Sequence, residues 1–356
     1  MVTLRAEDLA QLRKSYRSGN LVIYAGAGLS IDNGLPAWDK LVLAMYFSAI
    51  KRDDIVEAIR PFPNYLLAIA EWHLERRREP LDITARKVRN LYSDESLFMD
   101  KLHKTLYLPF KLPDSGVVTP PKTSALLKAN LTLKSVAQLC RGRAGRAGVR
   151  SVITYNYDTL LEIALGNKRA QPIWRANQTV KRGYLPIFHV HGYVPVDGER
   201  SSSDELVFTE EQYYVAAQNA YSWSNLVQLR HLTNSVGLMV GLSMTDRNMR
   251  RLLDALRKTP ISPENYALLL KPEWPKPEKP DIARIEVKAQ EYLNRFRKSG
   301  IKTGAKHYTQ IREIIDGVEE SDFVEQESVL RQLGVRPIWY SDHKEVPAVL
   351  KKIAKP

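Results

Sequence analysis

A short glycine-rich segment near the start of the chain has the residue types needed to hold a phosphate. Gly26, Ala27, Gly28 and Ser30 follow the apolar run 21–24, a pattern that predicts a buried strand turning tightly into a loop. Glycines let backbone N–H groups approach a pyrophosphate, and a following helix adds the positive end of its dipole. The spacing is GxG, so the dehydrogenase fingerprint GxGxxG is absent, and close helix packing is the structural alternative.

Two polar residues follow a second predicted strand. Residues 149–154 have strand character, and Asn156 and Asp158 come directly after them. Ligands bind at the carboxyl ends of the strands in an open parallel sheet, so both side chains are candidates for a binding site. The Asn156 amide can donate and accept hydrogen bonds, which suits the positioning of a water or of ribose hydroxyls. Capping of the next helix is its structural alternative.

Two histidines alternate in the segment 185–195. His189 and His191 are two residues apart, so a strand would place them on one face. An imidazole with an unperturbed pKa of about 6.5 can act as a general base near neutral pH, and His191 is our candidate for that role. The alternative for His191 is a satisfied buried histidine, and we expect His189 to be structural. A metal pair would lack a third ligand, so we expect no metal.

Strands and helices alternate along the whole sequence. This order predicts an α/β fold with a Rossmann-like, doubly wound, mostly parallel sheet. We expect a single domain over 1–356, with a helical insertion at about 53–130 and a charged, mostly helical segment at about 275–327. Thr209 and Gln212 have the spacing of a capping box. Further strands are expected at 205–209, 235–243, 266–271 and 335–340.

Composition limits the possible classes of function. The 356 residues include one cysteine, Cys140, which excludes an internal disulfide and a cysteine-built zinc site. No run of about 18 apolar residues and no secretory signal is visible, so we expect a cytoplasmic protein without a membrane span. The net charge of +13 favours polyanionic partners, but no nucleic-acid-binding motif accompanies it. Basic residues cluster at Arg76–Arg78, Arg86, Lys87 and Arg89, and at Arg141, Arg143, Arg146 and Arg150.

These motifs, taken in order, resemble the sirtuin (silent information regulator) family of NAD-binding proteins. The GAGLS loop at 26–30 is similar to the family's GAGxS, and GLP at 34–36 to the start of its GIPDFR segment. TYNYD at 154–158 resembles TQNID, and His191 with Gly192 resembles the family's HG. The segment 241–243 resembles its later GTS-type loop. The resemblance covers about residues 19–258 and the final strand and helix.

Two departures indicate which branch of the family the chain resembles. Sirtuin deacylases carry a four-cysteine zinc ribbon between the HG and GTS regions, and the interval 193–240 contains no cysteine. Ala37, Trp38 and Asp39 replace the DFR that follows GIP. The pattern is more similar to the sirtuin-like NAD hydrolases of prokaryotic antiphage defence, which arrest or kill an infected cell by depleting NAD.

The resemblance implies specific roles for the matching residues. It implies NAD as substrate, no metal, and Asn156 and His191 as the catalytic residues. Asp158 would orient the nicotinamide carboxamide. The residues implied to bind NAD are Gly26, Ala27, Gly28, Ser30, Pro36, Trp38, Asp158, Gly241 and Ser243. Trp38 would form a wall of the nicotinamide pocket, and the 241–243 loop would hold the adenosine side.

The resulting hypothesis is an NAD hydrolase acting as the effector of a defence system. No sensor domain is visible, so we expect control by homo-oligomerisation or by a separate partner such as a HerA-like ATPase. The basic clusters are candidates for that contact, with a solvated surface as the alternative and nucleic acid not indicated. Two other functions remain open: an NAD-dependent protein deacylase or ADP-ribosyltransferase, and a catalytically silent module that senses NAD or ADP-ribose.

Overall fold

The computed structural model describes most of the chain. The predicted helical insertion and charged segment lie partly outside the described residues. For residues 308–312 and 314, only the backbone is described. The described residues are 2–49, 72, 76, 79–92, 94–110, 117–142, 148–166, 170–258, 263–272, 280–281, 283–285, 287–288, 291 and 308–355.

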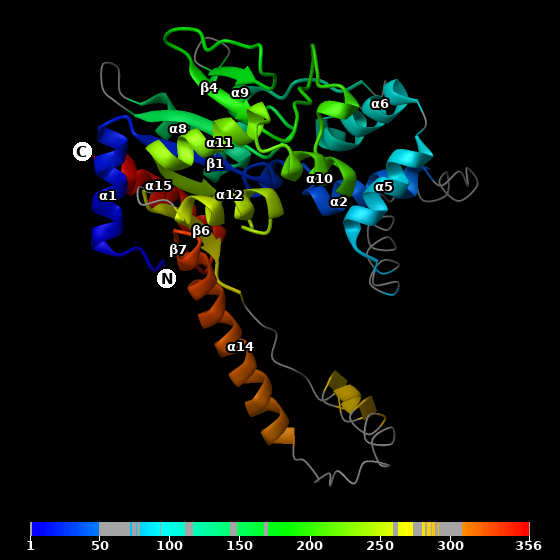
Figure 1. The fold of residues 1–356 in the computed structure, drawn as a ribbon, viewed down its shortest axis with the longest axis vertical. Helices are drawn as coiled ribbons and strands as arrows, with labels where there is room; N and C mark the ends of the chain where they lie inside the picture. Colours follow the sequence, from blue (N-terminus) through cyan, green and yellow to red (C-terminus); the bar gives the residue numbers. More distant parts are fainter. Residues whose placement is uncertain are drawn as a thin grey trace. The chain divides into compact units, whose positions relative to one another are not determined.

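A seven-stranded parallel sheet forms the centre of the fold (Figure 1). Its strand order is β3-β4-β2-β1-β5-β6-β7, and every pairing is parallel, which confirms the predicted Rossmann-like, doubly wound fold. The chain places β2, β3 and β4 on one side of β1, and then β5, β6 and β7 on the other. Such a reversal opens a crevice at the carboxyl ends of the strands. The strands are β1 (Leu21–Ala25), β2 (Val149–Thr154), β3 (Ala170–Ile173), β4 (Leu185–His189), β5 (Val236–Val240), β6 (Asn265–Leu270) and β7 (Val335–Tyr340).

Helices cover both faces of the sheet. On one face α8 packs against α9 and α15, and α1 lies beside α15. On the other, α11 packs against β4, β5 and α12 (Figure 1). These helices are α1 (Ala6–Arg17), α8 (Leu131–Arg141), α9 (Leu160–Leu165), α11 (Trp223–Asn234), α12 (Arg247–Arg257) and α15 (Val346–Ala354). The others are α2 (Trp38–Ala49), α5 (Leu81–Leu91), α6 (Glu95–Leu106), α7 (Thr123–Ala129), α10 (Glu210–Gln218) and α14 (Tyr308–Gln332).

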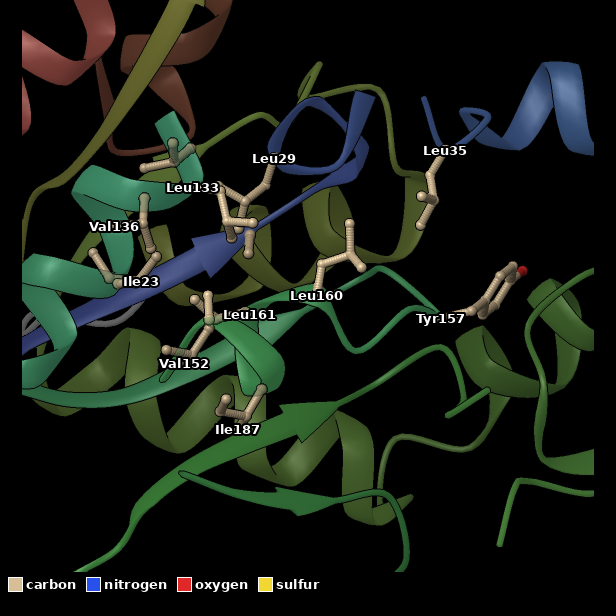
Figure 2. Close-up of a cluster of buried hydrophobic side chains, with 14 of the residues drawn as sticks. Ile23, Leu29, Leu35, Leu133, Val136, Val152, Tyr157, Leu160, Leu161 and Ile187 are labelled. Atoms are coloured by element: carbon tan, nitrogen blue, oxygen red, sulfur yellow. The ribbon is translucent and has the colours of Figure 1, made fainter. Parts of the chain in front are cut away.

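A row of apolar side chains crosses three neighbouring strands. Ile23 is in register with Val152, and Val152 with Ile187, and all three side chains are fully buried. Figure 2 shows them among Leu133 of α8 and Leu161 of α9. Burying each such side chain contributes about 1.5–3 kcal/mol. This packing fixes the positions of the strand ends from which the polar residues project.

The described chain divides into two compact units. One comprises Met1–Leu270 with Leu333–Pro356, and the other comprises Lys271–Gln332. The sheet and all the predicted site residues lie in the first unit. The second unit, inserted between β6 and β7, contains the helix α14. Its Glu327 accepts a hydrogen bond from Arg331 at 2.7 Å, one helical turn later.

Two elements differ from the expectations. The segment 205–209 forms no strand: its first residue ends a short 3₁₀ helix at Ser203–Glu205, and α10 begins directly after it at Glu210. The predicted capping box is present, since Thr209 and Gln212 bond reciprocally. The edge strand β3 was not predicted, because its residues AQPI contain a proline and too few β-branched residues to stand out.

The buried His231 makes the stability of the fold depend on pH. Burial, Arg150 and Arg230 lower its pKa to about 4, whereas an unfolded histidine titrates near 6.5. Between these values only the unfolded chain binds the proton, so acidification favours unfolding. We expect urea denaturation to show a loss of about 3 kcal/mol from this residue between pH 7 and pH 4. His231→Gln should lack this loss, and an unchanged pH dependence in the variant would contradict the assignment.

Candidate active site

A small cavity lies at the carboxyl edge of the sheet, where β1, β2 and β4 end. Its free volume is about 10 Å³, which is room for about one water molecule. In this conformation it is therefore too small for any part of a dinucleotide. Its walls combine polar and apolar side chains: Ala25, Leu29, Ser30, Thr154, Asn156, Asp158, Leu161, Glu162 and Ile187.

The glycines of the first loop allow two loops of the protein to touch. Gly26 N–H donates to Val240 O at 3.1 Å, and Gly28 N–H donates to Gly241 O at 3.0 Å. A Cβ on Gly26 would lie 2.5 Å from Gly241 O, and a Cβ on Gly28 would lie 2.8 Å from Gly241 Cα. Ala27 begins the 3₁₀ turn Ala27–Leu29 that follows. The close contact between the loops after β1 and β5 therefore requires glycine at these positions, whether or not a ligand binds.

The side chain of Asn156 faces this first loop. Its Nδ2 donates to Gly26 O at 3.1 Å and approaches Ser30 Oγ at 3.3 Å. Asn156 does not cap α9, whose N-cap residue is Thr159. The structural alternative of helix capping is therefore wrong for Asn156, and its amide lines the cavity instead.

Asp158 is a buried carboxylate that is fully engaged within the protein. Ser30 Oγ donates to Asp158 Oδ2 at 2.8 Å, and Leu160 N–H donates to Asp158 Oδ1 at 3.0 Å. Burial raises the pKa of Asp158, and the hydrogen bonds from Leu160 and Ser30 oppose that rise. Ser30, which is far in sequence from Asn156 and Asp158, thus joins them in one hydrogen-bonded cluster.

Asn130 is a buried support for this loop that the sequence did not reveal. Its side chain accepts a hydrogen bond from Leu133 N–H as the N-cap of α8. Its Nδ2 donates to Leu29 O at 2.8 Å and to Asn33 Oδ1 at 2.9 Å. The capping pattern Asn-Leu-Thr-Leu could be recognised in the sequence. The contacts of Asn130 with the loop could not, because they link residues about a hundred positions apart.

His189 is bonded through both ring nitrogens. Its Nδ1 lies 3.1 Å from Asn156 O, and its Nε2 lies 2.7 Å from Glu162 Oε1. The side chain is fully buried, and its ring stands edge-on to Tyr193 at 4.9 Å. Glu162 lines the cavity, so the pair connects the backbone of Asn156 to the cavity wall.

His191 lies beyond the end of β4, in a turn completed by Gly192 with φ of 112°. Its ring stands edge-on to Tyr155 at 4.9 Å and to Tyr213 at 5.6 Å. Its Nε2 lies 3.4 Å from Asp246 Oδ2. These are not the neighbours of His189, so the expectation that both histidines share one strand face is wrong.

The state of the His191 ring follows from its burial. It is 7% exposed, and burial lowers the pKa of His191, while the Asp246 carboxylate opposes that change. The ring is therefore neutral at pH 7, as a general base must be. The contact with Asp246 is close enough for an ion pair but lacks the alignment of a hydrogen bond. Among the described residues, His191 Nε2 has no hydrogen-bond partner.

The loop after β5 carries the other predicted site residues. Gly241 adopts φ of 68°, and Ser243 is exposed, with its hydroxyl 2.6 Å from that of Thr245. Between these two hydroxyls, Met244 is buried and also left-handed, with φ of 61°. Such a backbone is unfavourable for a side chain of this type, and it turns the chain toward Asp246 at the start of α12.

Pro36 and Trp38 do not line the cavity. Pro36 lies before α2, and Trp38 is the first residue of that helix. The Trp38 ring contacts Phe208 edge-on, with centroids 6.5 Å apart. The structure therefore brings Ser30, Asn156 and Asp158 together, and leaves Trp38 and His191 outside this cavity.

Those residues of the two basic clusters that the structure describes have partners within the chain. Arg86 pairs with Glu210 at 3.0 Å and Lys87 with Glu79 at 2.5 Å. Arg89 donates to Tyr92 O at 2.7 Å. Arg76 lies over the ring of Trp72, and Arg141 donates to Ala164 O. Arg150 donates to the side chains of Asn20 and Ser235. Arg77, Arg78, Arg143 and Arg146 lie outside the described residues.

In the part of the chain that the structure describes, no group of three or more His, Cys, Asp or Glu side chains is arranged to hold a metal ion. None of the described helices combines the length and apolar composition that crossing a membrane requires.

Part of the chain matches a known protein-family model. Residues 150–296 match the model of the SIR2-like domain. The SIR2-like region contains Asn156, Asp158, His191, Gly241 and Ser243, whereas the glycine loop at 26–30 precedes it. This match supports the resemblance to sirtuins and implies NAD binding and NAD-related activity. No curated protein matches the chain.

Proposed function

We propose that this protein is an NAD hydrolase. Water attacks C1′ of the nicotinamide ribose, the bond from C1′ to the nicotinamide nitrogen breaks, and the water proton passes to a base. The products are ADP-ribose, nicotinamide and one proton. Nicotinamide leaves as a neutral molecule, so the reaction needs a positioned water and a stabilised sugar cation more than a strong acid.

The hydrogen-bonded cluster of Ser30, Asn156 and Asp158 is the observation that carries this proposal. It lines a cavity at the carboxyl edge of the sheet, where β1, β2 and β4 end, and two of its members fall within the SIR2-like region. In the proposed mechanism Asn156 orients the ribose or the attacking water, and Asp158 orients the nicotinamide carboxamide. Ser30 and the amides of the glycine loop hold the pyrophosphate, which requires NAD to replace bonds now made within the cluster.

The other proposed contacts lie around this cluster. His191 takes the proton from water, because its ring is buried and neutral. Gly241 and Ser243 contact the adenosine side, and Pro36 and Trp38 border the nicotinamide. His191 and Trp38 are not in the cavity wall, so these roles require the bound state to extend the cavity toward them.

Hydrolysis is favoured over deacylation by the sequence between Tyr193 and Val240, which has no cysteine for the zinc ribbon of the deacylases. The role in cytoplasmic antiphage defence, with control by self-association or by a HerA-like ATPase, rests on the sequence resemblance alone. A protein deacylase or ADP-ribosyltransferase would instead release O-acyl-ADP-ribose or label protein from NAD.

The test is NAD consumption by the purified protein, alone and with a candidate partner, followed by chromatography of the products. We expect equal amounts of nicotinamide and ADP-ribose. Asn156→Ala should lower turnover by about 100-fold, because loss of alignment alone costs that much. Asn177, which is exposed and outside the cluster, provides the control: Asn177→Ala should match the wild type.

Two outcomes would contradict the proposal. O-acyl-ADP-ribose formed from an acylated peptide, or labelled protein formed from NAD, would indicate one of the transferase functions. Calorimetric NAD binding without turnover in every condition would indicate a silent sensor.

A further inference from the structure

The buried ring of His191 has one carboxylate neighbour among the described residues. Asp246 Oδ2 lies 3.4 Å from His191 Nε2. The rings of its two aromatic neighbours stand nearly perpendicular to it, at interplanar angles of 88° for Tyr155 and 83° for Tyr213. The Tyr155 hydroxyl is already committed to Gln228 Oε1 at 2.5 Å. The nearest polar group for Nε2 is therefore the Asp246 carboxylate.

Asp246 is itself held in place by its neighbours on α12. It is the N-cap residue of this helix, and its Oδ1 accepts a hydrogen bond from Met249 N–H at 2.7 Å. This bond uses Oδ1, while Oδ2 lies beside His191. The carboxylate also accepts a hydrogen bond from the Tyr213 hydroxyl, and its side chain is only 13% exposed. The helix cap and Tyr213 therefore hold the carboxylate in place next to the buried histidine.

We infer that Asp246 is a positioning residue for His191. A carboxylate beside Nε2 favours the tautomer that carries its proton on Nε2, and this leaves the lone pair of Nδ1 free to accept a proton from water. A small rotation of the ring aligns Nε2–H with Oδ2, as apo-state contacts of catalytic groups often tighten when substrate binds. The inference rests on the proposed function, because it assigns a partner to the base of that reaction.

The charges around the ring are few. Asp246 faces it from α12, and the neutral tyrosines face it from the end of β2 and from α10. Asp82 and Arg247 lie near Tyr213 and pair with each other at 3.5 Å. Removal of the Asp246 charge therefore changes the main electrostatic influence on His191.

Asp246→Asn tests the inference without removing the helix cap, because asparagine is as good an N-cap residue as aspartate. We expect kcat for NAD hydrolysis to fall by about 100-fold, with KM changed by less than about threefold, since the tautomer and not substrate binding is altered. The acid limb of the kcat/KM profile should move to lower pH, because the carboxylate that raises the pKa of His191 is gone. In a His191→Ala background the substitution should have no further effect on turnover.

A second readout does not depend on activity. In ¹⁵N-histidine-labelled protein, the signals of His191 are identified by their loss in His191→Ala, and their chemical shifts report the tautomer. We expect the Nε2–H form in the wild type and a shift toward Nδ1–H in Asp246→Asn. If this shift is seen but NAD is not hydrolysed, the positioning holds and the proposed function fails.

Asp94 provides a matched control. It caps α6 by accepting a hydrogen bond from Leu97 N–H at 2.7 Å, and no histidine contact is described for it. Asp94→Asn should leave both turnover and the His191 tautomer unchanged. An unchanged tautomer in Asp246→Asn, even with reduced stability, would show that Asp246 is only a helix cap and would overturn the inference.

Discussion

Replacement of His191 by alanine is expected to lower kcat/KM for NAD hydrolysis by about 10²–10⁴-fold, the contribution of a positioned general base. The proposed base is neutral near pH 7 because burial lowers the pKa of His191. In the wild type, activity should therefore be constant around neutral pH and fall only in acid, below the ordinary histidine value of about 6.5. This acid limb should be absent from the residual activity of the variant.

Controls separate lost chemistry from lost structure in this experiment. His191→Gln fills more of the space than alanine, and it should be as inactive while melting within a few degrees of the wild type. His343 is exposed, and His343→Ala should keep full turnover. Wild-type turnover in His191→Ala would mean that another group, such as Asp158, accepts the proton.

Gly241→Ala is expected to destabilise the fold by about 2–5 kcal/mol. Two effects add at this position. The left-handed backbone with φ of 68° is unfavourable for alanine. The new Cβ would also lie 2.6 Å from Leu29 N and 2.8 Å from Gly28 C, and these backbone atoms cannot move without displacing the loop at 26–30. Urea denaturation of the wild type and the variant measures the loss.

Gly183 separates the two effects. It has φ of 85°, and a Cβ there would meet no atom within 4 Å. Gly183→Ala should therefore cost only the backbone term of about 1–2 kcal/mol. An equal loss of unfolding free energy in the two variants would show that contact between the loops after β1 and β5 contributes nothing to stability.

The sheet could be predicted from the sequence because its central strands are continuous apolar runs. Residues 149–154 and 335–340 form strands with the predicted ends. The edge strand β3 and the irregular segment 205–209 could not be predicted, because tertiary contacts outweigh weak local preferences there. Parallel strands aligned at one edge also explain why Asn156 and Ser30 could be expected near each other.

The finer geometry of the site depends on contacts that local sequence does not encode. The turn at Gly192 directs His191 away from His189, and alternation along a strand cannot reveal this. Asp246 caps α12, and its contact with His191 joins two segments that are far apart in the sequence. The GxG spacing suggested phosphate binding, whereas the first requirement for these glycines is the approach of Gly241.

The position of β1 at the centre of the sheet has a consequence during synthesis. This strand leaves the ribosome early, but its two neighbours contain Val149 and Val236, its partners at Leu21. Because translation adds about 5–20 residues per second, the strand waits on the order of ten seconds or more for its second neighbour. Until β5 emerges, the glycine loop has no Gly241 to pack against, so the nascent chain cannot assemble the proposed NAD site. A fragment released before this point would therefore lack the proposed site altogether.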